Sequence, residues 1–266
     1  FRIESVRRPN DRDPGAPRWA ILVPNTDPLK NIRVVLCAPV HPGNIGAAAR
    51  AMKTMGLARL YLVAPRRFPD PEAEWRASRA TEVLAHATVC SALDDALQGV
   101  GLAIACTARS RELAVPEMTA REAAAEAVGV ARTQQVACVF GNETFGLTTA
   151  EVNCCQRLAT IPANSRYSSL NLAAAVQVIA YELRLAARGD AAGPVKQRQL
   201  ASFEELEGFY AHLERAMVEV GFFDPRHPKK LMPRLRRLFA RARVEREEIN
   251  ILRGIVTSFQ RHKLKR

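Results

Sequence analysis

The fold is decided by residues 34–64, which read VVLCAPVHPGNIGAAARAMKTMGLARLYLVA. The apolar runs Val34–Ala38 and Leu60–Ala64 have the length and composition of buried strands. Between them, Asn44 precedes a helical stretch, Ile45–Met55, that stops at a glycine, as expected for a helix with a polar N-cap and a glycine C-cap. The stretch therefore predicts a strand, a helix and a second strand.

The same alternation continues along the chain. Further apolar runs predict three more buried strands, at Leu102–Thr107, Val136–Phe140 and Leu158–Ile161. Helix starts and helical spacing predict three intervening helices: Ala92–Leu97 capped by Ser91 with Asp94, one opened by the capping box Thr148-x-x-Glu151, and a long one at about Ser169–Arg188. Such alternation predicts an α/β fold on a parallel sheet.

The chain is predicted to divide into four segments. Residues 1–30 hold five prolines among charges and form an N-terminal arm. The α/β domain follows at 31–188, and the glycines and proline of 189–201 indicate a linker. The capping box Ser202-x-x-Glu205 then opens a small helical domain, 202–266.

Charge is concentrated at the C-terminal end. The chain carries a net charge of +12, and 14 Lys/Arg against three acids between Arg226 and Arg266 account for +11 of it. Such a concentration indicates a polyanionic partner and favours RNA over an ordinary solvated face. Helical spacing places Lys230, Arg234, Arg237 and Arg241 on one face, which we predict to bind RNA, and Leu231, Leu235, Leu238 and Ala242 on another.

Other classes are disfavoured. The apolar stretch Leu170–Tyr181 is too short to cross a bilayer and contains Asn171 and Gln177. The first residues lack the apolar core of a signal peptide, so we expect a cytoplasmic protein without membrane association. The six cysteines include no C-x-x-C pair, and neither a metal site nor a disulfide is expected.

Three motifs follow predicted strands, where open α/β sheets bind ligands. They are His41–Arg50 (HPGNIGAAAR), Phe140–Leu147 (FGNETFGL) and Ile161–Leu172 (IPANSRYSSLNL). Each alone has an ordinary interpretation: a tight turn with a solvated arginine, a polar loop, or a helix N-cap at Ser168 or Ser169. Asn171, between two leucines, is predicted to find buried partners and to fix a loop.

Together the motifs resemble those of the SpoU/TrmH branch of the SPOUT superfamily of RNA methyltransferases. Within that branch, Ala51–Leu57 (AMKTMGL), Ala108–Arg111 (ARSR) and Tyr167–Ala173 (YSSLNLA) are most similar to the TrmJ family. The resemblance covers about residues 31–188 and is looser in the helical tail.

The resemblance implies a sheet whose C-terminal part threads a trefoil knot, a rare exception among folds. It further implies a homodimer with active sites completed across the interface. The expected reaction is 2′-O-methylation of tRNA, at a pyrimidine at position 32 of the anticodon loop, by S-adenosylmethionine with S-adenosylhomocysteine as product. The resemblance assigns donor binding to Cys106, Thr107, Ala108, Gly141, Ile161, Ser168, Ser169 and Leu170.

In this reaction the ribose 2′-hydroxyl attacks a methyl group in line, so the site must position the reactants and manage one proton. The candidate catalytic residues are Arg50, Arg111, Glu143, Ser169 and Asn171. By resemblance Arg111 contacts RNA and Ser169 the donor or the ribose. A guanidinium is a poor proton acceptor, so Arg50 is expected to clamp a phosphate and polarise the hydroxyl. Glu143, water and an RNA phosphate stay open as acceptors.

Three alternatives remain at this stage. The same fold could methylate ribosomal RNA or another tRNA position. A catalytically silent RNA-binding protein would share the basic tail, although intact Arg50, Glu143 and Asn171 argue against silence. A nucleotide-dependent oxidoreductase would need the G-x-G-x-x-G fingerprint and a downstream acid, which the chain lacks.

Overall fold

The α/β part is built on one sheet of seven parallel strands in the order β3-β2-β1-β6-β4-β7-β5. The structure is a computed structural model that describes residues 27–108, 117–164, 166–189 and 199–263. The strands are β1 (Ile32–Cys37), β2 (Arg59–Val63), β3 (Thr88–Cys90), β4 (Val100–Cys106), β5 (Glu117–Thr119), β6 (Gln135–Phe140) and β7 (Arg157–Thr160). The predicted fold class is confirmed, and the five predicted strands are β1, β2, β4, β6 and β7.

Sequence analysis missed the two outermost strands. Both β3 and β5 are three residues long and pair on one side only, with β2 and β7 respectively. Their residues are half-exposed or exposed. They therefore lack the continuous apolar run that identifies a strand buried on both faces.

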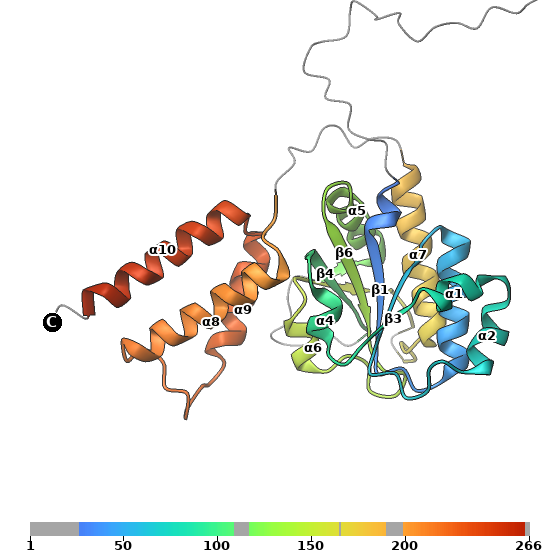
Figure 1. Cartoon of the computed structure of the whole chain (residues 1–266), viewed down its shortest axis with the longest axis horizontal. Coiled ribbons are helices and arrows are strands. Elements are labelled where there is room, and N and C mark those ends of the chain that lie inside the picture. Colours follow the sequence, from blue (N-terminus) through green and yellow to red (C-terminus); the bar gives the residue numbers. More distant parts are fainter. Residues whose placement is uncertain (1–26, 109–116, 165, 190–198, 264–266) are drawn as a thin grey trace, which may run out of the picture.

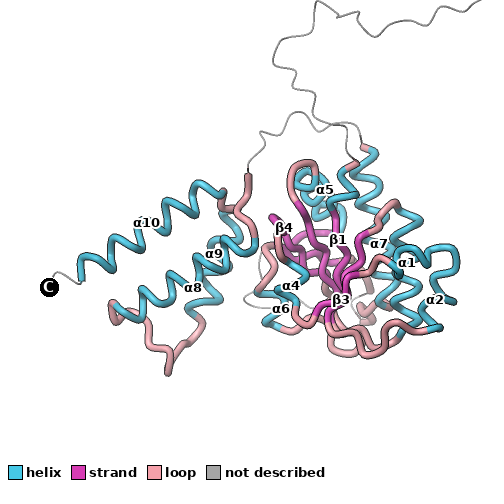
Figure 2. The backbone as a smooth tube through the Cα atoms, viewed as in Figure 1, coloured by secondary structure: helices cyan, strands magenta, loops and turns pink. Residues whose placement is uncertain are grey.

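Helices cover both faces of the sheet (Figures 1 and 2). They are α1 (Pro42–Met55), α2 (Pro71–Ala77), α3 (Thr81–Ala85), α4 (Leu93–Leu97), α5 (Ala120–Ala131), α6 (Thr149–Asn153) and α7 (Leu172–Arg188), with a 3-10 turn at Ser78–Ala80. Neighbouring residues of β1 point to opposite faces. Val34 joins a core formed with α1, α5 and α7, whereas Val35 joins a second core formed with α4 and α6.

Three predicted helix starts are corrected. Helix α1 begins at Pro42, because proline suits the first turn, so Asn44 lies inside the helix and is not its cap. Helix α4 begins at Leu93, and its capping carboxylate is Asp95, not Asp94. Helix α7 begins three residues later than predicted and is capped by Asn171, not by either serine. The capping boxes at Thr148 and Ser202 and the left-handed Gly56 at the end of α1 are as predicted.

The α/β domain includes residues before position 31. Pro28–Asn31 forms a 3-10 turn capped by Asp27, and Leu29 is completely buried in the first core. Residues 28–30 therefore belong to the α/β domain and not to the N-terminal arm. Residues 1–26 of that arm lie outside the described residues.

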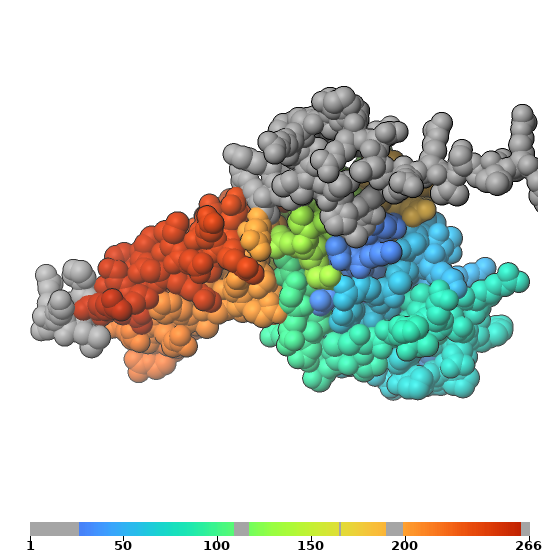
Figure 3. All heavy atoms as spheres, turned by 45° about the horizontal axis from the view of Figure 1, so that its top comes forward, coloured from blue at the N-terminus to red at the C-terminus, as the bar shows by residue number. Residues whose placement is uncertain are grey.

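The C-terminal region consists of α8 (Phe203–Glu219), α9 (Leu231–Ala242) and α10 (Arg246–Lys263). These helices share a small core of their own, which includes Phe209 and Val256. Phe203 and Ala240 pack instead into the second core of the α/β domain, so the tail lies directly against that domain (Figure 3). No helix in the described part of the chain is long and apolar enough to cross a bilayer.

Candidate active site

A cleft of about 860 Å³ opens at the carboxyl ends of β4, β6 and β7. All eight positions assigned to the methyl donor line it: Cys106, Thr107, Ala108, Gly141, Ile161, Ser168, Ser169 and Leu170. Parallel strands end at one edge of the sheet, and this is why residues far apart in sequence meet here.

A chain of hydrogen bonds joins the three predicted motifs beside this cleft. The Asn44 side-chain amide donates to Glu143 Oε1 at 3.0 Å, and the Asn171 amide donates to Asn44 Oδ1 at 3.0 Å. Asn171 Oδ1 in turn accepts from the backbone N–H groups of Ala173 and Ala174, which caps α7. The start of α1, the loop after β6 and the start of α7 are thus held together.

Asn171 therefore fixes a loop, as predicted, but not through burial. Its side chain is exposed, and its partners are a helix terminus and another amide. Asn44 was the residue that sequence reasoning missed. It was interpreted as a helix cap, and only the true start of α1 at Pro42 shows that its side chain faces Glu143.

Both carboxylate oxygens of Glu143 are occupied. Oε2 accepts from the backbone N–H of Val40 at 2.9 Å, and Oε1 accepts from the backbone N–H of His41 at 3.1 Å in addition to Asn44. Partial burial alone would raise the pKa of Glu143, but the hydrogen bonds from Asn44, Val40 and His41 outweigh it and lower that pKa. The carboxylate is therefore held in its charged form and is a weak proton acceptor.

The loop after β6 is folded tightly on itself. Asn142 Oδ1 accepts from the backbone N–H of Thr144 at 2.8 Å, and the Asn142 amide donates to Ala38 O at 2.8 Å. The backbone N–H of Gly146 donates to Asn142 O at 2.8 Å. A Cβ on Gly141 would lie 2.1 Å from the backbone of Gly146 and Leu147, so this position has no room for a side chain.

Two of the predicted catalytic residues, Arg50 and Asn171, are not among the described residues that line the cleft. Arg50 is exposed on α1, and six residues along the helix place it about 120° around the axis from Asn44, which contacts Glu143. Arg111 lies outside the described residues, as does Ser110. Ser169 lines the cleft and is exposed.

The predicted basic face occurs on α9, but the side chains that pack inward from this helix are not the leucines. Lys230 is the N-cap of α9, Arg234 and Arg241 are exposed, and Arg237 is half-buried. The predicted leucine face is not the packing face, since Leu238 is 48% exposed. The inward-facing side chains are those that directly follow the leucines in the sequence, together with Ala240. They are Met232, Arg236, Phe239 and Ala240.

Arg236 explains this difference. Its guanidinium pairs with Glu207 and stacks over the Tyr210 ring at 4.4 Å, so a charged side chain takes the place of a core residue. A hydrophobic pattern cannot identify such a position, because arginine is normally placed on the solvent side.

Comparison with known proteins agrees with this fold and cleft. The model of the SpoU rRNA methylase family matches residues 31–181, so the sheet and its cleft define a SpoU-type methyltransferase. The model described as the tRNA methyltransferase TrmJ C-terminal domain matches residues 204–266.

Individual relatives narrow the class. A protein of Yersinia enterocolitica named tRNA (cytidine/uridine-2′-O-)-methyltransferase TrmJ is 46% identical over 88% of this chain and 93% of its own length. One of the same name from Pectobacterium atrosepticum is 47% identical over 88% of this chain and 98% of its own. The crystal structure of TrmJ from Z. mobilis ZM4 superposes with a TM-score of 0.75 at 34% identity, over 86% of this chain and 98% of that one. The chain belongs to the TrmJ family.

Proposed function

We propose that this protein transfers the methyl group of S-adenosylmethionine to a ribose 2′-hydroxyl of tRNA in the cytoplasm, at a pyrimidine at position 32 of the anticodon loop. The observation that carries the proposal is the cleft itself. The eight positions assigned to S-adenosylmethionine line it. The hydrogen-bonded side chains of Glu143, Asn44 and Asn171 hold together the loops beside it. The names of the relatives, tRNA cytidine/uridine 2′-O-methyltransferases, support the substrate class.

The mixed polar and apolar lining of the cleft suits an adenosine attached to a charged amino acid. When bound, S-adenosylmethionine supplies an electrophilic methyl group. The protein's own part is to hold the donor by backbone groups near Thr107, Gly141 and Leu170, with Ser168 and Ser169 contributing hydroxyls. We propose that the chain is threaded into the family's trefoil knot around this cleft.

The assignment of Glu143 as a base is less favourable than a positioning role. Its oxygens already accept three hydrogen bonds and its pKa is lowered. Accepting a proton would weaken the hydrogen bonds that hold the loop after β6 in place. We therefore assign Glu143, together with Asn44 and Asn171, to holding the three loops of the cleft in register. This leaves the proton to water or to an RNA phosphate.

Arg50 and Arg111 keep their proposed roles toward RNA. Arg50 lies outside the cleft of its own chain, which is compatible with a homodimer in which each site is completed by the partner. In that arrangement Arg50 clamps a phosphate beside the target ribose and polarises its hydroxyl through a planar group of donors.

The helical tail supplies affinity in this proposal. Its basic face on α9, Lys230 with Arg234, Arg237 and Arg241, binds phosphates without reading the sequence. We propose the division into a methyltransferase domain up to residue 188, a linker and an RNA-binding helical domain from residue 202. The packing of Phe203 and Ala240 into the α/β core makes the tail unsuitable for deletion, since its removal would expose apolar surface.

The decisive experiment is incubation of the full-length protein with methyl-labelled S-adenosylmethionine and total tRNA, followed by mapping of the labelled ribose. We expect label on the 2′-oxygen of a pyrimidine at position 32. Label in ribosomal RNA, or at another tRNA nucleotide, would redirect the substrate while keeping the chemistry. Donor binding without any label in RNA would refute the enzymatic proposal.

A further inference from the structure

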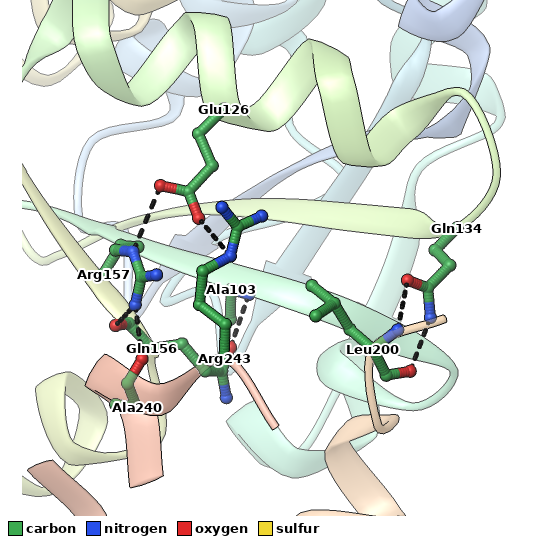
Figure 4. A network of polar contacts seen from close by, with 8 residues as sticks. All are labelled: Ala103, Glu126, Gln134, Gln156, Arg157, Leu200, Ala240 and Arg243. Atoms are coloured by element: carbon green, nitrogen blue, oxygen red, sulfur yellow. Dashed lines mark hydrogen bonds and ion pairs between the residues drawn. The ribbon is translucent and has the colours of Figure 1, made fainter. Parts of the chain in front are cut away.

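A buried ion pair of the methyltransferase domain lies where the helical tail packs against that domain, and both of its members contact the tail (Figure 4). Arg157 begins β7 and Glu126 lies in α5, and their side chains are only 6% and 10% exposed. Arg157 Nε donates to Glu126 Oε2 at 3.1 Å. Arg243, the residue that follows α9, approaches Glu126 Oε1 to 3.4 Å with its Nε. Two arginines, one from each domain, thus share a single buried carboxylate.

Arg157 also caps α9, the helix that carries the basic face. Arg157 Nη1 donates to Ala240 O at 2.6 Å and to Gln156 O at 2.9 Å. Ala240 is in the last turn of α9, where carbonyl groups have no partner within the helix. A cation at a helix C-terminus is also electrostatically favourable. The methyltransferase domain therefore supplies the C-terminal cap of α9.

The tail has a second attachment at the start of α8. The Gln134 side chain donates to Leu200 O at 2.8 Å and accepts from the Leu200 N–H at 3.2 Å. The backbone N–H of Gly99 donates to Glu204 Oε1 at 2.6 Å, and Phe203 packs in the second core. The tail is thus fixed at two places, the start of α8 and the end of α9.

We propose that Glu126 and Arg157 are positioning residues that determine which ribose is methylated, by fixing the basic face of α9 relative to the cleft. This inference rests on the proposed function. A body attached at two places keeps its orientation, whereas one attached only at the start of α8 could pivot. With the pair intact, RNA bound along α9 presents one nucleotide to the cleft.

The path from the pair to the cleft is short and stiff. Strand β7 runs from Arg157 to Thr160, and the next residue, Ile161, already lines the cleft. Four strand residues span roughly 13 Å at about 3.3 Å each. Neighbouring strands β4 and β5 hold β7 on both sides. Any rotation of α9 about its other attachment would therefore change where bound RNA lies relative to the cleft.

A contribution to folding stability is not enough to explain the buried Glu126–Arg157 pair. Apolar side chains of similar volume often replace a buried ion pair without loss, whereas removal of one partner leaves an uncompensated charge. The double variant Glu126→Met with Arg157→Met removes both charges and keeps the volume. Arg243 can then turn to solvent, because 44% of its side chain is already exposed. The matched control is Arg121→Met with Glu182→Met, which removes a pair between α5 and α7 whose arginine is 79% exposed.

The full-length double variant and the control are compared with the wild type in three measurements. These are S-adenosylmethionine affinity by calorimetry, tRNA affinity at fixed salt, and the map of methylated riboses with turnover at each. We expect both affinities to stay within about twofold. Turnover at the wild-type ribose should fall at least tenfold, with methyl groups appearing at neighbouring nucleotides, while the control should match the wild type. Arg157→Lys, which keeps the charge without the planar fork, should fall in between.

Methylation of the same single ribose at wild-type turnover by the double variant would overturn the proposal, and so would a joint loss of both affinities. Small-angle X-ray scattering tests the attachment without RNA. We expect a larger radius of gyration for the double variant than for the wild type, and an unchanged scattering profile would also overturn the proposal. A wild-type protein that methylates no RNA would refute the proposed function, and scattering would still decide the attachment.

Discussion

Replacement of Gly141 by alanine should weaken donor binding while leaving the protein folded. The added Cβ would lie 2.1 Å from Gly146 C and from Leu147 N, and 2.6 Å from Gly146 O. Contacts between a Cβ and other atoms become ordinary only at 3.4 Å, so the two sides of the loop must separate by about 1.3 Å. Both obstacles are backbone, which cannot turn aside as a long side chain can.

The displaced segment carries Asn142 and Glu143. Glu143 accepts from the Val40 N–H at 2.9 Å, and a movement of about 1.3 Å would stretch that distance beyond any hydrogen bond. One hydrogen bond to a charged group is worth about 1.5–3 kcal/mol. We expect donor binding to require the loop in its undisplaced position, so that this cost is subtracted from the binding free energy. The affinity for S-adenosylmethionine, measured by calorimetry, should then fall by roughly 10- to 150-fold, at about 1.4 kcal/mol for each factor of ten.

Gly129→Ala is the matched control. Gly129 lies in α5, and a Cβ there would meet nothing within 4 Å. This substitution should leave donor affinity unchanged and raise stability by about 0.5–1 kcal/mol, because alanine favours the helix. If Gly141→Ala binds the donor as tightly as the wild type, the loop does not shape the donor site and the reasoning is wrong.

Three further predictions concern other parts of the molecule. Arg50→Ala should leave donor affinity intact and lower turnover on tRNA at least about a hundredfold, with little rescue by Arg50→Lys, and near-normal turnover would remove Arg50 from the mechanism. Arg234→Glu and Arg241→Glu should each reduce the slope of log tRNA affinity against log salt by about one. Arg132→Glu, at the exposed residue that follows α5, should not, and equal slopes in all three variants would place RNA elsewhere. Because the pKa of Glu143 is lowered on folding, its contribution to stability is present above the unfolded value of about 4.3 and is lost as the pH falls through the folded value. Glu143→Gln should therefore lose less stability than the wild type in thermal unfolding between pH 6 and pH 3, and parallel curves would count against the role of this carboxylate.

The strands that carry the cleft could be predicted because parallel strands covered on both faces are continuous apolar runs. Once β4, β6 and β7 were placed, the meeting of their following loops was a consequence of sheet geometry. The link between Asn44 and Asn171 could not be predicted in the same way. It joins residues 127 positions apart and depends on the exact start of α1, which the sequence analysis placed after Asn44 and which lies at Pro42.

The helical tail shows a second reason why part of the structure could not be predicted from the sequence. Helical periodicity separated a basic face from an apolar face on α9, but periodicity does not say which face packs inward. Arg236 and Arg157 were indistinguishable from solvated arginines in the sequence. Arg157 is buried and Arg236 is half-buried, and each is paired with a carboxylate from another element, Glu126 and Glu207 respectively. Pairing across elements is a property of the fold, and one sequence contains no signal for it.

The hydrogen bonds that Glu143 already accepts bear on where the proton of the ribose hydroxyl goes. Glu143 is the one carboxylate among the described residues that line the cleft, and three donors already hold it in its charged form. Protonation would weaken all three bonds at once and loosen the loops that shape the donor site. A sulfonium methyl is a strong electrophile, so a well-aligned hydroxyl can lose its proton late, to water or to a phosphate of the RNA. Glu143→Gln keeps the size of the side chain but cannot accept a proton, so its turnover with saturating donor and tRNA tests this directly. Turnover within about tenfold of the wild type would agree, whereas a loss of at least about a hundredfold with donor affinity unchanged would make Glu143 the acceptor after all.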